Sequence, residues 1–187
     1  YSAEALVRWP DENGGFRNTS EFIHFAESTG LIIPLDRYVF EKACRTAKKW
    51  VEKGNDALRL SVNVSTRHFK RGDLADNISE VLEATGFPAE RLNLEITETA
   101  LMTNLQSASA TLIELNSMGV TFSLDDFGTG YSSLYYLKTL PVQSLKIDKR
   151  FISLIESQST DGDIFVKTIL SMADNLGLNT VAEGVET

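Results

Sequence analysis

The sequence predicts an α/β fold, and more specifically a (β/α)8-type barrel of which about six of the eight strands are present. Three observations lead to this prediction. Six short apolar runs alternate with helical patterns, which is typical of parallel sheets built from β–α units. The internal runs each divide into an apolar face and a polar face. The polar faces end in polar, mostly ionisable groups at the same end of successive strands, where the active sites of barrels lie.

The expected strands are short apolar runs with turn-forming residues around them. They cover residues 4–9, 58–65, 91–98, 120–127, 144–148 and 179–186. Three stretches between them carry apolar residues on one helical stripe and end at a glycine, which often follows the last residue of a helix. These predicted helices begin at about residues 34, 105 and 161 and end before Gly54, Gly119 and Gly177.

The alternation of side chains favours a barrel over a doubly wound sheet. In the fourth run, Phe122 and Leu124 point to one face while Ser123 and Asp125 point to the other. The same division occurs in residues 61–65, 93–97 and 144–148. A doubly wound sheet is covered by helices on both faces, so its strands should be apolar almost throughout. In a barrel, the apolar face packs against the outer helices and the polar face lines the interior.

Acidic residues gather at the carboxyl ends of these strands, together with one amide and one lysine. The set is Glu4, Asn63, Glu95, Asp125, Asp126, Lys146 and Glu183. Each acid alone is best interpreted as a solvated charge. Five acids at one level of a barrel would repel one another unless cations neutralised them. Oxygen ligands without Cys or His are typical of Mg²⁺ or Mn²⁺ sites rather than Zn²⁺ sites.

The Asp125–Asp126 pair raises a geometric question. Asp125 shares the interior face with Ser123, whereas Asp126 falls on the face of Leu124 and should point to the helices. If Asp126 also belongs to the site, the chain must leave regular β geometry there. Gly128 and Gly130 follow directly and permit a tight turn.

Seven segments in order make the sequence similar to a known family, the EAL-domain phosphodiesterases that hydrolyse cyclic di-GMP. The segments are "EALVRW" with Glu4-Ala5-Leu6, "EFIHFAESTGLI", "VNVS", "LEITE", "DDFGTGYSSL", "LKIDKRFI" and "VAEGVET". The resemblance covers essentially the whole chain. It implies a (β/α)8-type barrel and hydrolysis of cyclic di-GMP to linear pGpG by water that two metal ions activate.

The resemblance also assigns roles to individual residues. It implies that Glu4, Asn63, Glu95 and Asp125 bind one Mg²⁺ or Mn²⁺ ion, and that Asp125, Asp126 and Glu183 bind a second. Lys146 would hold the attacking water, and either Glu183 or Lys146 would assist its deprotonation. Glu98 would anchor the loop that contains Gly128, Thr129 and Gly130, and Glu186 would support the second ion.

Some features depart from the family pattern. Residues 1–187 are expected to form one EAL domain that lacks a strand before the EAL motif and a last strand after "EGVET", the latter with a site glutamine. His68 stands where the family commonly has Gln, and we expect it on an exposed helix surface. The alternative function is an inactive EAL domain that serves as a cyclic di-GMP receptor or a protein-interaction module. A different Mg²⁺-dependent barrel enzyme is a third interpretation, on the fold alone.

Composition excludes some functions and suggests a location. The net charge of −8 argues against binding of long nucleic acid, because such binding depends on contacts of Lys and Arg with phosphates. A single cysteine, Cys44, suits a reducing compartment, and no apolar run approaches the ~20 residues of a membrane helix. We therefore expect a cytoplasmic domain, whose parent protein is tethered to a membrane in some family members. The resemblance further implies a homodimer and other signalling domains in the same parent chain.

Overall fold

A computed structural model describes residues 2–102, 105–128, 134–156 and 160–185 of the chain. Its strands form one sheet in the order β1-β2-β3-β4-β5-β6, and each neighbouring pair is parallel. The strands are β1 (Ser2–Ala5), β2 (Arg59–Val64), β3 (Leu92–Thr97), β4 (Thr121–Phe127), β5 (Ser144–Ile147) and β6 (Asn179–Ala182). All six lie in the predicted runs or overlap them, and the sheet confirms the predicted parallel α/β architecture.

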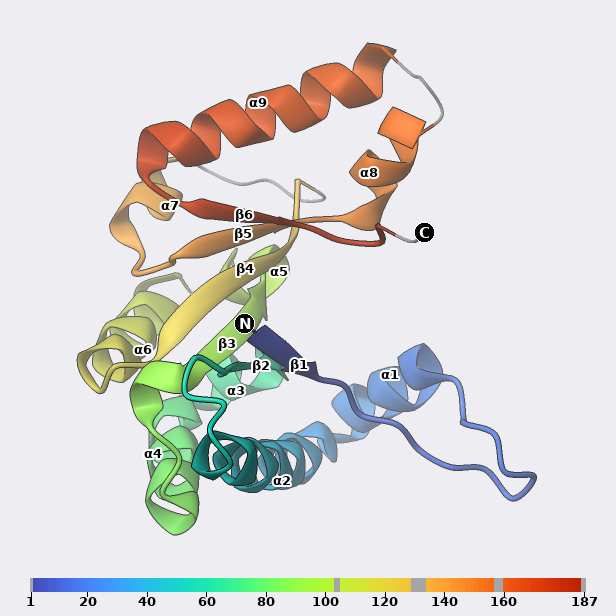
Figure 1. Ribbon diagram of the computed structural model, residues 1–187, viewed down its shortest axis with the longest axis vertical. Helices are drawn as coiled ribbons and strands as arrows, with labels where there is room; N and C mark the ends of the chain where they lie inside the picture. Colours follow the sequence, from blue (N-terminus) through green and yellow to red (C-terminus); the bar gives the residue numbers. More distant parts are fainter. Residues whose placement is uncertain (1, 103–104, 129–133, 157–159, 186–187) are drawn as a thin grey trace.

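Helices connect the strands and follow the outer side of the curved sheet, with α2 and α4 at one end and α9 at the other (Figure 1). Their bounds are α1 (Thr19–Thr29), α2 (Ile32–Glu52), α3 (Thr66–Arg71), α4 (Leu74–Thr85), α5 (Glu98–Met102), α6 (Leu105–Ser117), α7 (Leu134–Thr139), α8 (Lys149–Glu156) and α9 (Thr160–Leu176), with a short 3-10 turn at Ala89–Arg91. The three predicted helices correspond to α2, α6 and α9. Within the described ranges, no helix is long and apolar enough to cross a membrane.

The two faces of the sheet differ as the alternation predicts. Leu94, Phe122, Leu124 and Leu145 are buried on the outer face, in a core that extends to the helices. The opposite parity is polar and lines a cavity of about 380 Å³ inside the curve of the sheet. Glu4, Glu95 and Lys146 are among the residues that line it, so side chains from β1, β3 and β5 meet in one hollow.

The first and last strands are shorter than predicted. β1 ends at Ala5 rather than residue 9, because the last residue pair between β1 and β2 is Ala5 with Val62. β6 ends at Ala182 rather than residue 186, and the chain turns at Gly184, whose φ is +69°. Glu183 consequently lies just beyond β6, where its amide donates a hydrogen bond to the carbonyl of Ile147 in β5 at 3.1 Å.

The expectation of an exposed His68 is wrong. His68 has an exposed fraction of 0% on α3, with its Nε2 atom 3.2 Å from Asp36 Oδ2 and its Nδ1 atom 3.5 Å from Asp73 Oδ1. The Phe40 ring packs beside it. Burial raises the pKa of Asp36, and the adjacent imidazole opposes this shift. His68 therefore lies between α2 and the start of α4, close to two carboxylates, although neither ring nitrogen has a hydrogen-bond partner among the described residues.

Candidate metal centre and its lysine

The carboxyl ends of β1 to β5 each deliver one predicted site residue of the interior parity to the hollow of the sheet, and β4 also carries Asp126. The residues of the interior parity are Glu4, Asn63, Glu95, Asp125 and Lys146, in strand order. Glu183 joins them from the segment after β6. In each strand the side chain belongs to the interior parity, so the polar alternation of the sequence brings together residues up to 179 positions apart.

Lys146 lies at the centre of the acids. Its Nζ atom is 2.7 Å from Glu95 Oε2, 2.8 Å from Glu183 Oε1, 3.3 Å from Asp125 Oδ2 and 4.0 Å from Glu4 Oε1. Its side chain is 8% exposed. Burial would lower the pKa of Lys146, but the hydrogen bonds to Glu183 and Glu95 outweigh burial and raise it above the ordinary value. The ammonium is thus a fixed positive charge shared by four carboxylates from four parts of the chain.

Glu95 is the most deeply buried of these carboxylates, with an exposed fraction of 4%. Burial raises its pKa to about 7, although the hydrogen bond from Lys146 opposes the shift. The charges of Glu4 and Asp125 add to the increase. Beside it, Asn63 donates a hydrogen bond from Nδ2 to Glu4 Oε1 at 2.9 Å. Three neighbouring strands thus present oxygen atoms at one level.

Asp126 reaches the site because β4 is irregular at this point. Its φ is +53°, a left-handed conformation that is uncommon for residues other than glycine. The pairing of β4 with β5 shifts between Leu124 and Phe127. The predicted departure from β geometry is confirmed. The Asp126 amide donates a hydrogen bond to Asp125 Oδ1 at 2.9 Å, which orients the two carboxylates relative to each other.

Asp125, Asp126 and Glu183 each offer a carboxylate oxygen, and these atoms lie within 4.8 Å of one another. Burial, followed by the charge of Asp125, raises the pKa of Asp126. Carboxylates held this close together repel unless a cation or a proton is shared among them. The donor set, the spacing and the raised pKa fit a site for a hard divalent cation.

Of the other predicted site residues, the structure describes Glu98 and Gly128 only. Glu98 begins α5 and is 3% exposed, and among the described residues neither of its carboxylate oxygens has a hydrogen-bond partner. Gly128 has a φ of +94° and lies against Phe151, whose ring would be 2.9 Å from an added Cβ atom. Thr129, Gly130 and Glu186 lie outside the described residues.

One acid near the site was not among the predicted site residues. Asp148 is 5% exposed and lies two residues after Lys146, on the same interior parity. Its carboxylate accepts hydrogen bonds from the Arg150 amide at 2.7 Å and from the Arg150 guanidinium at 3.0 Å. These bonds lower the pKa of Asp148 to about 2, and the Asp148 charge contributes to the raised pKa of Asp126. In the sequence, the indication that Asp148 lies near the site is that it falls on the same strand face as Lys146, two residues later.

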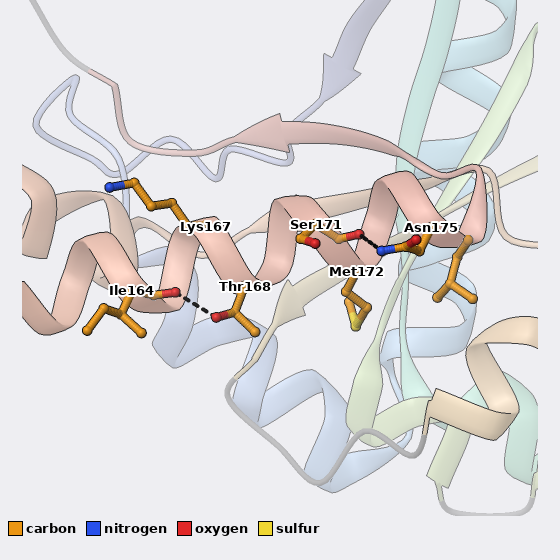
Figure 2. Close-up of a pocket in the computed structure, with 7 residues that line it drawn as sticks. Ile164, Lys167, Thr168, Ser171, Met172 and Asn175 are labelled. Carbon is orange, nitrogen blue, oxygen red and sulfur yellow. Dashed lines mark hydrogen bonds between the residues drawn. The ribbon is translucent and has the colours of Figure 1, made fainter.

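A second hollow has different chemistry. A groove of about 680 Å³ runs along α9. Figure 2 shows that Ile164, Thr168 and Met172, which line it, point to the same side of the helix. The Thr168 hydroxyl and the Asn175 amide bond to carbonyls of their own helix, Ile164 O and Ser171 O. Its lining residues in the described chain include no carboxylate. The candidate site is therefore the interior cavity beside Glu4, Glu95 and Lys146, not this groove.

Comparisons with known proteins agree on the fold and the kind of domain. The EAL domain family matches residues 1–187. The chain is 42% identical over 187 residues to Cyclic di-GMP phosphodiesterase NbdA of Pseudomonas aeruginosa, covering all of this chain and 24% of that protein. It is 40% identical over 184 residues to the bifunctional diguanylate cyclase/cyclic di-GMP phosphodiesterase MucR of the same species, covering 98% of this chain and 27% of the relative.

The solved structure of the PaMucR phosphodiesterase in complex with c-di-GMP is similar, with a TM-score of 0.94 and 38% identity. The match covers 98% of this chain and 74% of that one. The similarity supports a (β/α)8-type barrel for the six-stranded sheet. The chain spans about a quarter of the length of the curated relatives that it matches.

Proposed function

Because this chain belongs to the EAL domain family, we propose that it hydrolyses one phosphodiester bond of cyclic di-GMP and releases linear pGpG. The observation that carries the proposal is the convergence of four carboxylates on Lys146 at the open end of the barrel. The relatives named as cyclic di-GMP phosphodiesterases support the same substrate.

We propose two metal sites, each for Mg²⁺ or Mn²⁺. Glu4, Asn63, Glu95 and Asp125 would hold one ion, and Asp125, Asp126 and Glu183 would hold the other. The oxygen-only donor set supports a hard cation. When bound, such ions supply positive charge that polarises a phosphodiester and lowers the pKa of water.

The residues of the chain would then orient the reaction. Lys146 has three N–H donors and no acceptor, and four carboxylates within 4.0 Å keep it protonated. It would donate a hydrogen bond to the attacking water and hold it in place. Glu183 Oε1, 2.8 Å from Lys146 Nζ, is the oxygen that we propose accepts the proton of that water. Of the two predicted bases, the geometry favours Glu183.

Several predictions from the resemblance stay predictions. They concern the loop-anchoring role of Glu98, the roles of Gly128, Thr129, Gly130 and Glu186, the homodimer, the cytoplasmic location, the further signalling domains and the two strands that would complete the barrel. Glu98 is the best supported of these, since a buried carboxylate without a hydrogen-bond partner among the described residues requires one from elsewhere.

The test is to incubate the protein, at its natural length, with cyclic di-GMP and Mg²⁺ or Mn²⁺ and to separate the products by chromatography. We expect pGpG from the wild type, no product from Glu4→Ala or Asp125→Ala, and wild-type rates from Asp163→Ala, an exposed acid on α9. Tight binding of cyclic di-GMP without turnover would contradict the proposal and support the receptor.

A further inference from the structure

A second layer of polar side chains lies directly beneath the site. Each of the five strands from β1 to β5 carries one polar residue two positions before its site residue. We call this layer the polar belt; it consists of Ser2, Ser61, Asn93, Ser123 and Ser144. Residues two apart on a strand share a face, so the belt lines the same cavity as the acids. Barrel interiors are usually filled by branched apolar residues at this level, so the polar composition requires another explanation.

Hydrogen bonds connect the belt from strand to strand. The hydroxyls of Ser2 and Ser61 lie 3.4 Å apart, and those of Ser123 and Ser144 lie 2.6 Å apart. Asn93 connects the two halves, because its Nδ2 atom donates to Ser61 Oγ at 3.1 Å and to Ser123 Oγ at 2.9 Å. Its Oδ1 atom lies 3.1 Å from Ser123 Oγ and accepts from Thr121 Oγ1 at 3.2 Å.

Asn93 is therefore bonded to both neighbours of its own strand. Ser61 is on β2 and Ser123 is on β4, and the exposed fraction of each is 6%. The next interior residues of β2, β3 and β4 are Asn63, Glu95 and Asp125. The side-chain bonds add to the backbone ladder between these strands, and they do so at the level immediately below the carboxylates.

We propose that Asn93 is a positioning residue, which ties β2, β3 and β4 together and fixes the spacing of the site residues that these three strands carry. The inference rests on the proposed metal sites. An amide suits this role because its nitrogen donates to both neighbouring strands and its oxygen accepts from β4, without adding charge under a cluster of acids. Residues that hydrogen-bond to metal ligands and orient them lower the metal affinity by about 10- to 100-fold when they are removed.

The test compares Mn²⁺ binding to the wild type and to Asn93→Leu, by calorimetry and by the electron paramagnetic resonance signal of free Mn²⁺. Leucine keeps the branching of Asn93 at Cγ, with two methyl groups in place of the amide oxygen and nitrogen, and removes its four hydrogen bonds. We expect Mn²⁺ to bind about 10-fold more weakly. The matched control is Asn175→Leu on α9, whose amide bonds only to the carbonyl of Ser171, and we expect it to bind Mn²⁺ as the wild type does.

Ser123→Ala provides a second, smaller change if Asn93→Leu does not fold. It removes one hydroxyl between Asn93 and Ser144, and we expect several-fold weaker Mn²⁺ binding with a circular dichroism spectrum like that of the wild type. A purely structural role would lower the unfolding temperature without changing the dissociation constant of the folded protein. Unchanged Mn²⁺ binding in both variants would overturn the inference.

The outcomes also separate this inference from the proposed function. If the wild type binds Mn²⁺ but hydrolyses no cyclic di-GMP, the proposed activity is wrong, and the dissociation constants alone decide the role of Asn93. If the wild type binds no Mn²⁺ at millimolar concentration, the metal sites and the positioning role are both overturned.

Discussion

Replacing Lys146 by methionine would remove the positive charge at the centre of the acids while keeping most of the side-chain volume. The wild-type ammonium contacts Glu95 at 2.7 Å, and both side chains are almost completely buried. Breaking a buried ion pair by removing one partner destabilises proteins by roughly 3–5 kcal/mol, because the other charge stays buried and unpaired. We expect Lys146→Met to lose stability of this order at pH 8 without divalent ions, and urea unfolding followed by tryptophan fluorescence measures it.

The control for this prediction is Lys167→Met on α9. Lys167 also forms an ion pair, with Asp163 at 3.1 Å, but its side chain is 75% exposed and the pair is worth at most about 1 kcal/mol. The double variant Lys146→Met with Glu95→Gln should be more stable than Lys146→Met alone, since it removes both charges. The reasoning is refuted if Lys146→Met and Lys167→Met have the same free energy of unfolding, or if Glu95→Gln gives no recovery.

Three further predictions concern single residues of the metal-free chain. Burial raises the pKa of Glu95 from 4.5 to about 7, so the folded chain keeps a proton that the unfolded chain has released. Stability should therefore fall by about 3 kcal/mol as the pH rises through this window, and urea unfolding at pH 5 and 8 should show no such fall for Glu95→Gln. His68→Ala would leave a cavity beside Phe40 and leave Asp36 with only the Ser65 amide as a partner, and should cost about 3 kcal/mol in thermal unfolding, whereas a smaller loss is expected for His68→Gln; a neutral alanine variant would contradict this. Asp126→Val should be roughly 1–3 kcal/mol less stable than Asp126→Gly in urea, because a β-branched residue is strained at a φ of +53°, and equal stabilities would show that the backbone there relaxes.

The alternation of residue types predicted the composition of the site well. A period of two assigns Asn63, Glu95, Asp125 and Lys146 to the interior face, and the structure brings three of these side chains into direct contact. The same rule showed that Asp126 did not belong on a regular strand, and β4 is irregular there. Local periodicity was sufficient because each of these residues lies within a strand or at its end.

Features that depend on what packs above a segment were harder to predict. His68 lies on a six-residue helix with charged neighbours, which is typical of an exposed segment. Its burial comes from Asp36, 32 positions earlier, and from the Phe40 ring. The polar belt likewise consists of ordinary serines and one asparagine in the sequence. Its continuity depends on the register between strands, such as Ser61 opposite Asn93, which periodicity within one strand does not specify.

The irregularity in β4 has a genetic consequence. Three residue steps from Leu124 to Phe127 lie opposite two steps from Leu145 to Ile147, so β4 contains one extra residue at the carboxylate pair. Loss of one codon at position 125 or 126 would let the strand pair regularly, with Phe127 still on the outer face and a single aspartate inside. We expect the sheet to tolerate such a deletion, while the proposed site of Asp125, Asp126 and Glu183 would lose one of its three carboxylates. A single in-frame deletion would therefore separate the pairing of β4 with β5, which needs only one residue at this point, from the proposed second metal site, which needs two.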